Sequence, residues 1–403
     1  PMQRLLRSLN RLPLPLQRFF RALRGPRSPI FTLYLLASGA RPRPVPPPTE
    51  LPDAPRRVYI APVNAAEQAM LWAAALEAEV PGLGARSMMA PVVGGSIFES
   101  TEPVPLGAFH LSKSWQRAEF ERAAEFTHVL VESQEAMFGG LFRYDPAREI
   151  EALRGRGVSI AALSHGSDTR SPRAHAERTP WSPFREHHPE TAMLQHLADA
   201  NRERLARLEL PVFVSTPDLL DDLPLAHWCP LIVEPVFHSA ASEPLLGERL
   251  PVVTHIPSRG WLKGTELIEP VAASLAERGV VAYRPLEGVP RERMAEAYAS
   301  ADILLEQFRL GSYGATAIEA MAAGRVVVGH VLPSVREHVR RTTGLELPIV
   351  EADPDSLSEA VEGLVADPDR MRELGARGRD FVSAVHDGRL SAAALSEHWI
   401  DRG

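Results

Sequence analysis

A glycine-rich turn between a predicted strand and a predicted helix carries the clearest chemistry in the sequence. The strand ends near Glu306, a helix begins near Ala315, and the turn between them contains Gly311, Ser312, Tyr313 and Gly314. Glycines let backbone N–H groups approach an anion closely, and a helix N-terminus adds oriented donors and about half a positive charge. The hydroxyls of Ser312 and Thr316 add further donors. This pattern predicts a site for a phosphate group.

Glu319 lies one helical turn beyond Thr316. A carboxylate at that depth does not suit a phosphate, but it suits a diol such as a ribose because it accepts two hydroxyl hydrogen bonds. The alternative is a plain strand–turn–helix unit with a solvated Glu319, since glycine-rich turns alone are weak signals.

A second loop with phosphate-binding residue types follows a predicted strand at 252–256. It contains Ser258, Arg259, Gly260, Lys263 and Gly264. Arginine grips a phosphate with two hydrogen bonds, and lysine acts as a point charge. If the two strands are neighbours, Arg259 and Lys263 reach the same cleft edge as the glycine turn. The alternative is a solvated pair of basic side chains.

An unusually polar segment follows the predicted strand at 158–163 and contains His165, Asp168, Arg170 and His175. A histidine at a strand end that faces a cleft can bond a sugar hydroxyl or the reacting centre. We expect His165 to be catalytic, with Asp168 and Arg170 as weaker acceptor-binding candidates. Asp168 and Arg170 have an alternative role, in which they pair with each other and shape the loop.

The first predicted strand–turn, residues 61–70, contains Asn64 and Gln68 and has no glycine. Both side chains are weak candidates for binding acceptor hydroxyls. The competing interpretation, which we favour, is that Asn64 caps the following helix. A long proline-rich segment, 169–190, carries Trp181 and Phe184, which either stack on a sugar or pack beneath the loop.

The elements that position these residues form two series of alternating strands and helices. Apolar, β-branched strands that alternate with helices predict parallel sheets covered on both faces. The first series has strands at 58–61, 86–90, 128–132, 158–163 and 212–215, and the second at 252–256, 280–283, 303–306, 326–329 and 347–350. Two doubly wound Rossmann-like domains that face a central cleft place a ligand at the carboxyl ends of the strands.

The stretch 301–331, together with the Arg259/Lys263 loop, resembles the donor domain of GT-B glycosyltransferases, most closely the family 4, or group 1, type. The resemblance implies an N-terminal arm (1–49), an acceptor domain (50–240), a donor domain (250–385) and a C-terminal helix that crosses back (386–403). It implies that Arg259 and Lys263 hold the diphosphate of a nucleotide sugar and that Glu319 holds its ribose. It also implies a metal-independent, retaining reaction in which the donor phosphate takes the acceptor proton, and it supports His165.

The sequence departs from that family at one position of the donor motif. A second glutamate commonly stands eight positions before the ribose glutamate, and that position here is Gly311. The missing carboxylate would touch the donor sugar, so the identity of that sugar stays open. Arg259 also lies four positions before Lys263, where five is commoner.

Composition and charge exclude several classes of protein. The chain has 403 residues and a formal charge of −7. Its one cysteine, Cys229, rules out a disulfide framework and a cysteine-rich zinc site, and we expect no metal site and no resident cofactor. Residues 1–49 carry nine arginines and no acidic residue, so the rest carries −16 (−7 − 9). An acidic body argues against nucleic acid as a partner.

The arm 1–49 interleaves arginine with leucine and phenylalanine, which favours an anionic lipid surface or an acidic protein. The alternative is a tail that is poorly ordered or docks locally. Residues 30–37 loosely resemble a signal-peptide core, or form a short strand or helix. We expect a cytoplasmic protein, with peripheral association at the inner face of the membrane.

We therefore expect a glycosyltransferase that moves a hexosyl unit from a nucleoside diphosphate sugar to a glycan or glycolipid, in bacterial cell-surface polysaccharide biosynthesis. Two alternatives stay open. One is a GT-B nucleotide-sugar epimerase, which would share the donor site. The other is a catalytically inactive glycosyltransferase-like subunit that binds a partner through residues 1–49, an idea motivated by Gly311 and the glycine-free first turn.

Overall fold

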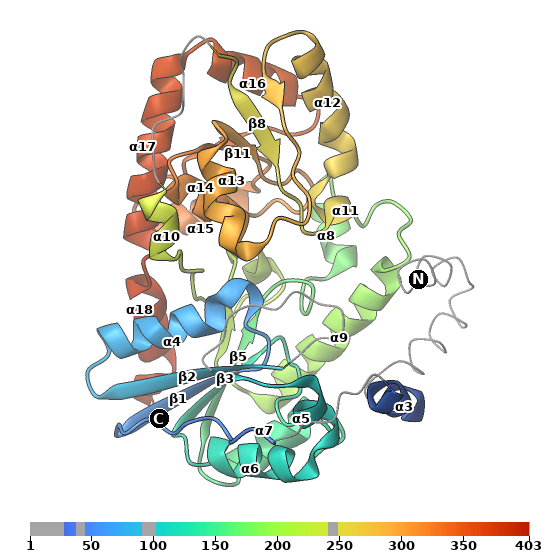
Figure 1. Cartoon of the computed structure of the whole chain (residues 1–403), viewed down its shortest axis with the longest axis vertical. Coiled ribbons are helices and arrows are strands. Elements are labelled where there is room, and N and C mark those ends of the chain that lie inside the picture. Colours follow the sequence, from blue (N-terminus) through green and yellow to red (C-terminus); the bar gives the residue numbers. More distant parts are fainter. Residues whose placement is uncertain (1–27, 38–44, 91–101, 241–248, 403) are drawn as a thin grey trace. The chain divides into compact units, whose positions relative to one another are not determined.

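Two sheets form the framework of the chain (Figure 1). The computed structural model describes residues 28–37, 45–90, 102–240 and 249–402. The first sheet has the order β3-β2-β1-β4-β5-β6-β7, with strands Glu102–Pro103 (β3), Leu83–Met89 (β2), Arg56–Ala61 (β1), His128–Glu132 (β4), Ser159–Ser164 (β5), Val212–Val214 (β6) and His227–Trp228 (β7). The second has the order β12-β11-β10-β8-β9, with strands Ile349–Glu351 (β12), Val326–Gly329 (β11), Ile303–Leu305 (β10), Val252–His255 (β8) and Ala282–Tyr283 (β9).

The chain divides into two compact units. The first contains the described residues up to Ser164, residues Ala200–Val212 and those from His398 onward. Strands β1 to β5 pair in parallel within it. Its helices are Pro29–Ala37 (α3), Ala65–Glu67 (η1), Gln68–Glu79 (α4), Leu106–Leu111 (α5), Lys113–Ala123 (α6), Pro146–Arg154 (α7) and Ile400–Arg402 (η4).

The second unit contains His165–Asp199 and Phe213–Glu397, and all four strand pairs of its five-stranded sheet are parallel. Helix α9 (Thr191–Leu208) begins in this unit and ends in the first. The other helices are Pro172–Arg178 (α8), Pro217–Asp221 (η2), Pro235–Ser239 (α10), Gly260–Lys263 (α11), Thr265–Glu277 (α12), Arg291–Arg293 (η3), Met294–Ala299 (α13), Ala315–Ala322 (α14), Pro333–Thr343 (α15), Leu357–Val365 (α16), Pro368–Val385 (α17) and Arg389–His398 (α18).

Local sequence explains these elements. Strands β4, β8, β10 and β11 are rich in valine, isoleucine and leucine and buried along their whole length, as strands covered on both faces must be. Helices α7 and α17 begin with an aspartate cap followed by proline, and the Asp145 and Asp367 side chains accept backbone N–H bonds. In Figure 1, α12 and α16 lie together at one end of the second unit, where they pack on each other.

The end of the chain packs into the first unit. The indole of Trp399 is buried, donates to the Ser159 hydroxyl at 3.0 Å and meets the His128 ring edge to face at 5.2 Å. The unit boundaries differ from the expected ones: residues 165–199 and 213–240 belong to the second unit, and so do residues 386–397 of the expected crossing helix. The cause is a set of contacts from the segment after β5 to the glycine turn, described below.

Most expected elements are present, and one substantial helix was missed. Helix α15 follows β11, with Pro333 in its first turn and Gly344 as its left-handed C-cap. Its polar sequence hid it, although Val335 and Val339 give it a buried face. Residues 30–37 lie in a helix; residues 1–27 and 38–44 of the expected arm lie outside the described residues, as do residues 241–248 between the two expected domains. Within the described ranges, every helix is too short or too polar to cross a bilayer.

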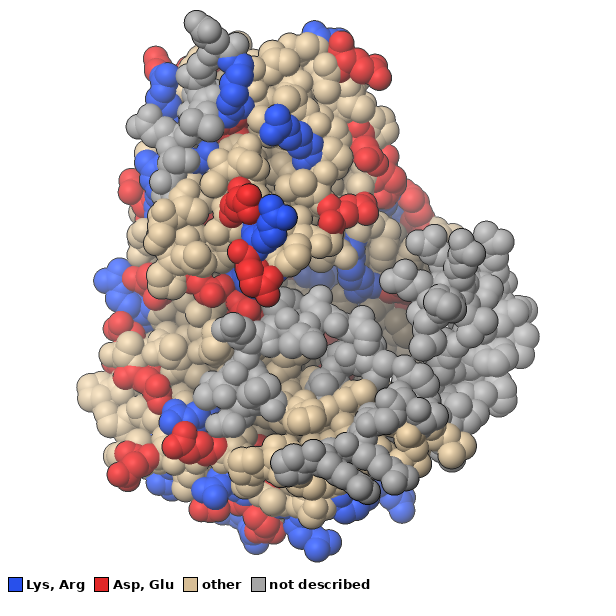
Figure 2. All heavy atoms as spheres, in the orientation of Figure 1, with Lys and Arg blue, Asp and Glu red and all other residues tan. Residues whose placement is uncertain are grey.

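The surface of the described residues is mixed in charge. On the face drawn in Figure 2, lysine and arginine side chains are interspersed with aspartate and glutamate side chains. Many of the arginines form ion pairs with carboxylates, among them Arg170 and Arg259, which the sequence assigned to the site.

Candidate functional site

Lys263 and the N-terminus of α14 meet in the second unit. Lys263 is the last residue of α11, and its Nζ lies 2.7 Å from Oε2 of Glu306 and 3.4 Å from Oγ1 of Thr316. Strand β10 ends directly before Glu306, and β8 precedes α11, so the two neighbouring strands deliver these side chains to one sheet edge. The expected convergence of the lysine loop and the glycine turn is therefore present within this unit.

The backbone of the glycine turn is held by buried polar side chains. Gly311 has φ +68°, and a Cβ atom there would collide with the side chain of Leu332. Gln307 accepts from Leu310 N at 2.8 Å and donates to the Ser312 carbonyl. His175 lies 3.0 Å from the Leu310 carbonyl through Nε2. Position 311 thus requires glycine for both conformation and space.

Two side chains of the turn point into the protein. Tyr313 is buried, and its hydroxyl lies 3.4 Å from Nε2 of His386. Ser312 is also buried. Ser312 and Tyr313 therefore offer a ligand their backbone amides, while the Tyr313 side chain anchors the turn to His386.

Glu319 lies on α14, and both of its carboxylate oxygens accept hydrogen bonds. Arg291 donates to Oε1 at 2.6 Å, and the Tyr298 hydroxyl donates to Oε2 at 2.9 Å. Arg291 also pairs with Glu234 and lies over the Phe237 ring, 4.8 Å from its centre. The burial of Tyr298 and the charge of Glu319 raise the pKa of Tyr298, so it is a donor at neutral pH. Both carboxylate oxygens of Glu319 are therefore held in a fixed orientation.

Arg259 contacts a carboxylate and an aromatic ring. It forms an ion pair with Glu190 and lies over the Trp261 ring, 5.5 Å from its centre. Trp261 also stacks on His188 at 3.6 Å and contacts Phe184. Phe184 therefore packs beneath the 169–190 segment. Ser258 is exposed between β8 and α11.

Two buried aspartates, Asp168 and Asp218, hold the polar segment after β5 in place. Asp168 Oδ1 accepts from the backbone N–H groups of His165, at 3.1 Å, and Gly166, at 2.7 Å. Arg170 and Asp168 do not pair as one alternative expected; Arg170 donates to Asp218 from Nε at 3.0 Å and from Nη2 at 2.5 Å. Although burial opposes the ionisation of Asp218, the charge of Arg170 lowers the pKa of this carboxyl, so the two buried groups form an ion pair.

The two weak acceptor candidates of the first unit are buried. Asn64 Oδ1 accepts from Met70 N in α4 at 3.2 Å, which is the capping role, and Gln68 Nε2 donates to the Ala66 carbonyl at 3.2 Å. The glycine-free turn has a glycine-like backbone, with positive φ at Asn64, Ala66 and Glu67. Buried Glu132 steadies it by accepting from the amides of residues 63 and 64. Such stored strain marks a functional site more often than an ordinary turn.

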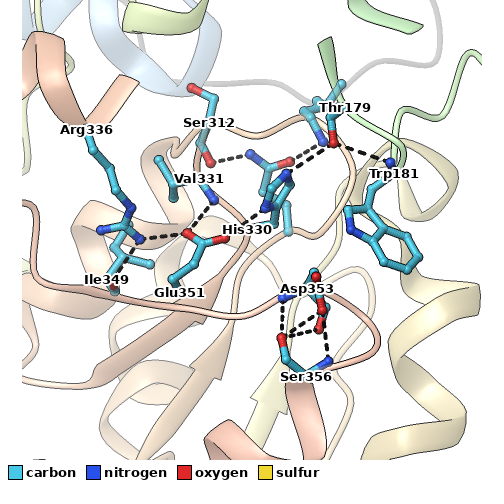
Figure 3. Close-up of polar contacts among 12 residues, drawn as sticks. Thr179, Trp181, Ser312, His330, Val331, Arg336, Ile349, Glu351, Asp353 and Ser356 are labelled. Atoms are coloured by element: carbon cyan, nitrogen blue, oxygen red, sulfur yellow. Dashed lines mark hydrogen bonds and ion pairs between the residues drawn. The ribbon is translucent and has the colours of Figure 1, made fainter. Parts of the chain in front are cut away.

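A cavity of about 730 Å³ lies beside α15. Its lining consists mainly of polar side chains: His330, Arg336, Arg340, Glu337 and Glu351. Figure 3 shows His330 bridging Thr179, at 3.3 Å, and Glu351, at 2.8 Å, while Arg336 also bonds Glu351. Burial opposes the ionisation of Glu351, but hydrogen bonds from His330, Val331 and Arg336 lower its pKa. None of the sequence-predicted site residues lines this cavity. Among the described residues, no group of three or more metal-ligating side chains is present.

Sequence reasoning missed the side chains that partner the site residues. These are Glu306, Gln307, Arg291, Tyr298, Glu190 and Asp218. A signal was present only for Glu306 and Gln307, which are polar and come directly after a buried strand. The others lie far from the motifs along the chain, so only tertiary structure shows their partners.

Comparison with known proteins agrees with this geometry. Residues 244–396 match the family described as glycosyl transferase-like. D-inositol 3-phosphate glycosyltransferase of Geodermatophilus obscurus is 31% identical over 156 residues, 38% of this chain and 33% of the relative. The Streptomyces bingchenggensis enzyme of the same name is 30% identical over 185 residues, 44% and 39% of the two chains. The chain thus matches little more than a third of the length of these relatives.

Solved structures extend the likeness to the fold of most of the chain. Sucrose-phosphate synthase of Thermosynechococcus elongatus has a TM-score of 0.52 at 14% identity and covers 86% of this chain and 98% of its own. A Rickettsia africae glycosyltransferase also gives 0.52, at 9% identity, with the same coverage. Anabaena HepE, solved with UDP and glucose, gives 0.50 at 11% identity and covers 85% and 98%.

The chain has the GT-B fold, and its second unit is similar to group 1 glycosyltransferases. The resemblance inferred from the Arg259/Lys263 loop and the glycine turn is confirmed as a likeness of this kind, and assignment to family 4 stays a prediction. The family match spans the second sheet and the turn and ends within α18.

Proposed function

We propose that this glycosyltransferase transfers a hexosyl unit from a nucleoside diphosphate sugar to a glycan or glycolipid, with retention at the anomeric carbon and without a metal ion, in cell-surface polysaccharide biosynthesis. The observation that carries the proposal is the convergence of Lys263, Thr316 and Glu306 at the N-terminus of α14, with Glu319 one turn further along. Anabaena HepE, of similar fold, was solved with UDP and glucose, which supports a nucleotide-sugar donor.

The geometry fits the binding of a diphosphate. The lysine ammonium has three N–H donors, and contacts with Glu306 and Thr316 use two of them, so the third is left for a phosphate oxygen. The amides of the turn and of the first residues of α14 supply the other donors. Groups that are already fixed stabilise the charge that develops on a departing diphosphate more effectively than water, which must reorganise.

The remaining residues take roles around that diphosphate. Glu319, fixed by Arg291 and Tyr298, accepts the ribose hydroxyls. Arg259 is half-exposed and reaches the diphosphate after exchanging its partner Glu190. The backbone of His165 is fixed by Asp168, and its ring orients the sugar or the acceptor.

A thermal-shift screen tests the donor assignment. The chain is melted with UDP, GDP, ADP and dTDP and with the matching hexose nucleotides. A ligand at 100 times its Kd raises the stability by about 2.7 kcal/mol. We expect one base family to shift the melting temperature, and Lys263→Ala to abolish the shift while the exposed-surface control Glu296→Gln retains it. If no nucleotide shifts the wild-type protein, the inactive-subunit alternative motivated by Gly311 is favoured instead.

Turnover separates the reactions that share this site. Incubation of the bound hexose nucleotide without acceptor, followed by NMR, detects an epimerase through a changed hexose. A glycosyltransferase gives only slow hydrolysis until a glycan or glycolipid acceptor is added. The NMR coupling constant of the anomeric proton in the product shows whether the anomeric configuration is retained. An unchanged transfer rate in the presence of EDTA would support a metal-independent reaction.

The membrane part of the proposal rests on the composition of residues 1–49 and on α3. Leu33 and Leu36 of α3 are 64% and 38% exposed, and Phe31 contacts His110 of α5 at 5.1 Å. Sedimentation with vesicles that contain anionic phospholipid compares the full chain with a chain lacking residues 1–27. Equal sedimentation of the two chains would reject peripheral membrane binding through the arm.

A further inference from the structure

The two carboxylate oxygens of Glu306 differ in their hydrogen bonding. Oε2 accepts from Lys263 at 2.7 Å, and the side chain of Glu306 is 4% exposed. Among the residues that the structure describes, no hydrogen bond reaches Oε1. A ligand that donates a hydroxyl to this charged oxygen gains a charge-assisted hydrogen bond, which adds binding energy.

The glycine turn leaves space in front of this oxygen. A Cβ atom at Gly314 would lie 3.8 Å from Oε1, so the glycine keeps a side chain away from that approach. Gly314 is the N-cap of α14, the place where the proposed diphosphate meets the backbone amides. The open oxygen and the proposed diphosphate therefore share one small region.

Position 311 cannot hold a carboxylate that would do the same work. Gly311 has a left-handed backbone, and a side chain there would collide with Leu332. Glu306, five positions earlier, instead reaches the region from the end of β10. The carboxylate at this edge of the sheet is thus supplied by a different element.

We propose that Glu306 contacts the donor sugar: Oε2 holds Lys263, and Oε1 accepts a hydroxyl of the transferred hexose. The inference rests on the proposed nucleotide-sugar donor. The hexose is attached to the phosphate that Lys263 binds, so its hydroxyls come within reach of a carboxylate 2.7 Å from that ammonium. A bare nucleoside diphosphate has no hydroxyl for Oε1 and meets only the negative charge of Glu306.

Paired binding measurements test this assignment. Kd values are measured by calorimetry for UDP and UDP-glucose, GDP and GDP-mannose, and ADP and ADP-glucose, with wild type, Glu306→Gln, Glu306→Asp and the control Glu296→Gln. For the pair that binds, Glu306→Gln should raise the Kd of the sugar nucleotide about tenfold, which corresponds to the loss of one charge-assisted hydrogen bond. It should leave the nucleoside diphosphate unchanged or bound more tightly, because a competing negative charge is gone.

The two Glu306 variants separate contact from charge. Glu306→Asp keeps the negative charge, but its shorter side chain moves the carboxylate oxygen away from the hexose. We therefore expect it to lower the affinity for the sugar nucleotide only. If Glu306→Gln changes the affinity of both ligands by the same factor, Glu306 acts only through Lys263 and the proposal is overturned. Unchanged melting temperatures show that the variants fold. If wild type binds neither member of any pair, the proposed donor itself is wrong and this inference fails with it.

Discussion

Arg291 donates to the carboxylate of Glu319 at 2.6 Å, although 27 residues separate them and they lie on different helices. The hydroxyl of Tyr298 bonds the other oxygen of Glu319 at 2.9 Å. The carboxylate proposed to hold the ribose is thus fixed before any ligand binds. A preorganised acceptor loses less conformational entropy on binding than a free side chain.

Tyr298→Phe should therefore weaken nucleotide binding and lower stability. Removal of the hydroxyl leaves a buried carboxylate with one donor fewer, at a cost of about 1–2 kcal/mol in unfolding free energy, and we expect Kd for the nucleotide to rise several-fold. Tyr283→Phe is the matched control, because its hydroxyl is buried without a partner among the described residues. Urea melts and calorimetry measure the two effects. Equal behaviour of the two variants would contradict a role for the Tyr298–Glu319 bond.

Gly311→Ala should destabilise the protein more than alanine at an ordinary left-handed glycine. Positive φ costs about 1–2 kcal/mol for a non-glycine residue, and the collision with Leu332 adds about 1–3 kcal/mol of overpacking. Gly344→Ala is the control, since φ there is +75° and no atom lies within 4 Å of the added Cβ. Chemical denaturation compares the two. If both variants lose the same free energy, Leu332 does not restrict position 311.

Acid should weaken the second unit through two histidines that hold the glycine turn. Burial lowers the pKa values of His175 and His386 to about 4, from the usual 6.5. Between these values the unfolded chain binds protons that the folded chain does not, so unfolding free energy falls as pH falls from 6.5 to about 4, by about 1.4 kcal/mol per unit of pKa difference. Above pH 6.5 the contribution is complete.

Urea melts between pH 7 and 4 check this dependence with His386→Gln. The variant should be less stable at pH 7, because it loses the bond to the Leu231 carbonyl at 2.7 Å, and its stability should fall less steeply with acid. His196 is exposed, so His196→Gln should keep the wild-type slope. A His386→Gln slope identical to wild type would contradict a lowered pKa of His386 in the folded protein.

Glu190→Gln should tighten the binding of a nucleoside diphosphate. Arg259 must leave Glu190 to reach the diphosphate, and its side chain is 41% exposed, so the pair is worth at most about 1 kcal/mol. The expected gain in affinity is therefore about two- to fivefold. Glu177→Gln, an exposed glutamate of α8, should not change Kd. A weaker affinity in Glu190→Gln would mean that the pair holds the 169–190 segment in the binding-competent form.

The order of strands and helices follows from the chain alone, because hydrophobic periodicity and turn residues are local. Strand β4 has the bounds that the pattern predicted, 128–132. Helix α15 was missed because its polar residues outnumber the two valines of its buried face. The glycine turn and the lysine loop were recognisable for the same reason as the strands: their residue types and spacing are short-range properties.

The sequence by itself determined the parallel α/β architecture, the likeness to glycosyltransferases and the meeting of Lys263 with the turn, since adjacent parallel strands end at one edge. Only the tertiary structure decided the partners. It gave Arg170 to Asp218, Arg259 to Glu190 and Glu319 to Arg291. These pairs join residues that are distant along the chain. Their partners depend on how whole helices and strands pack, which no local sequence pattern encodes.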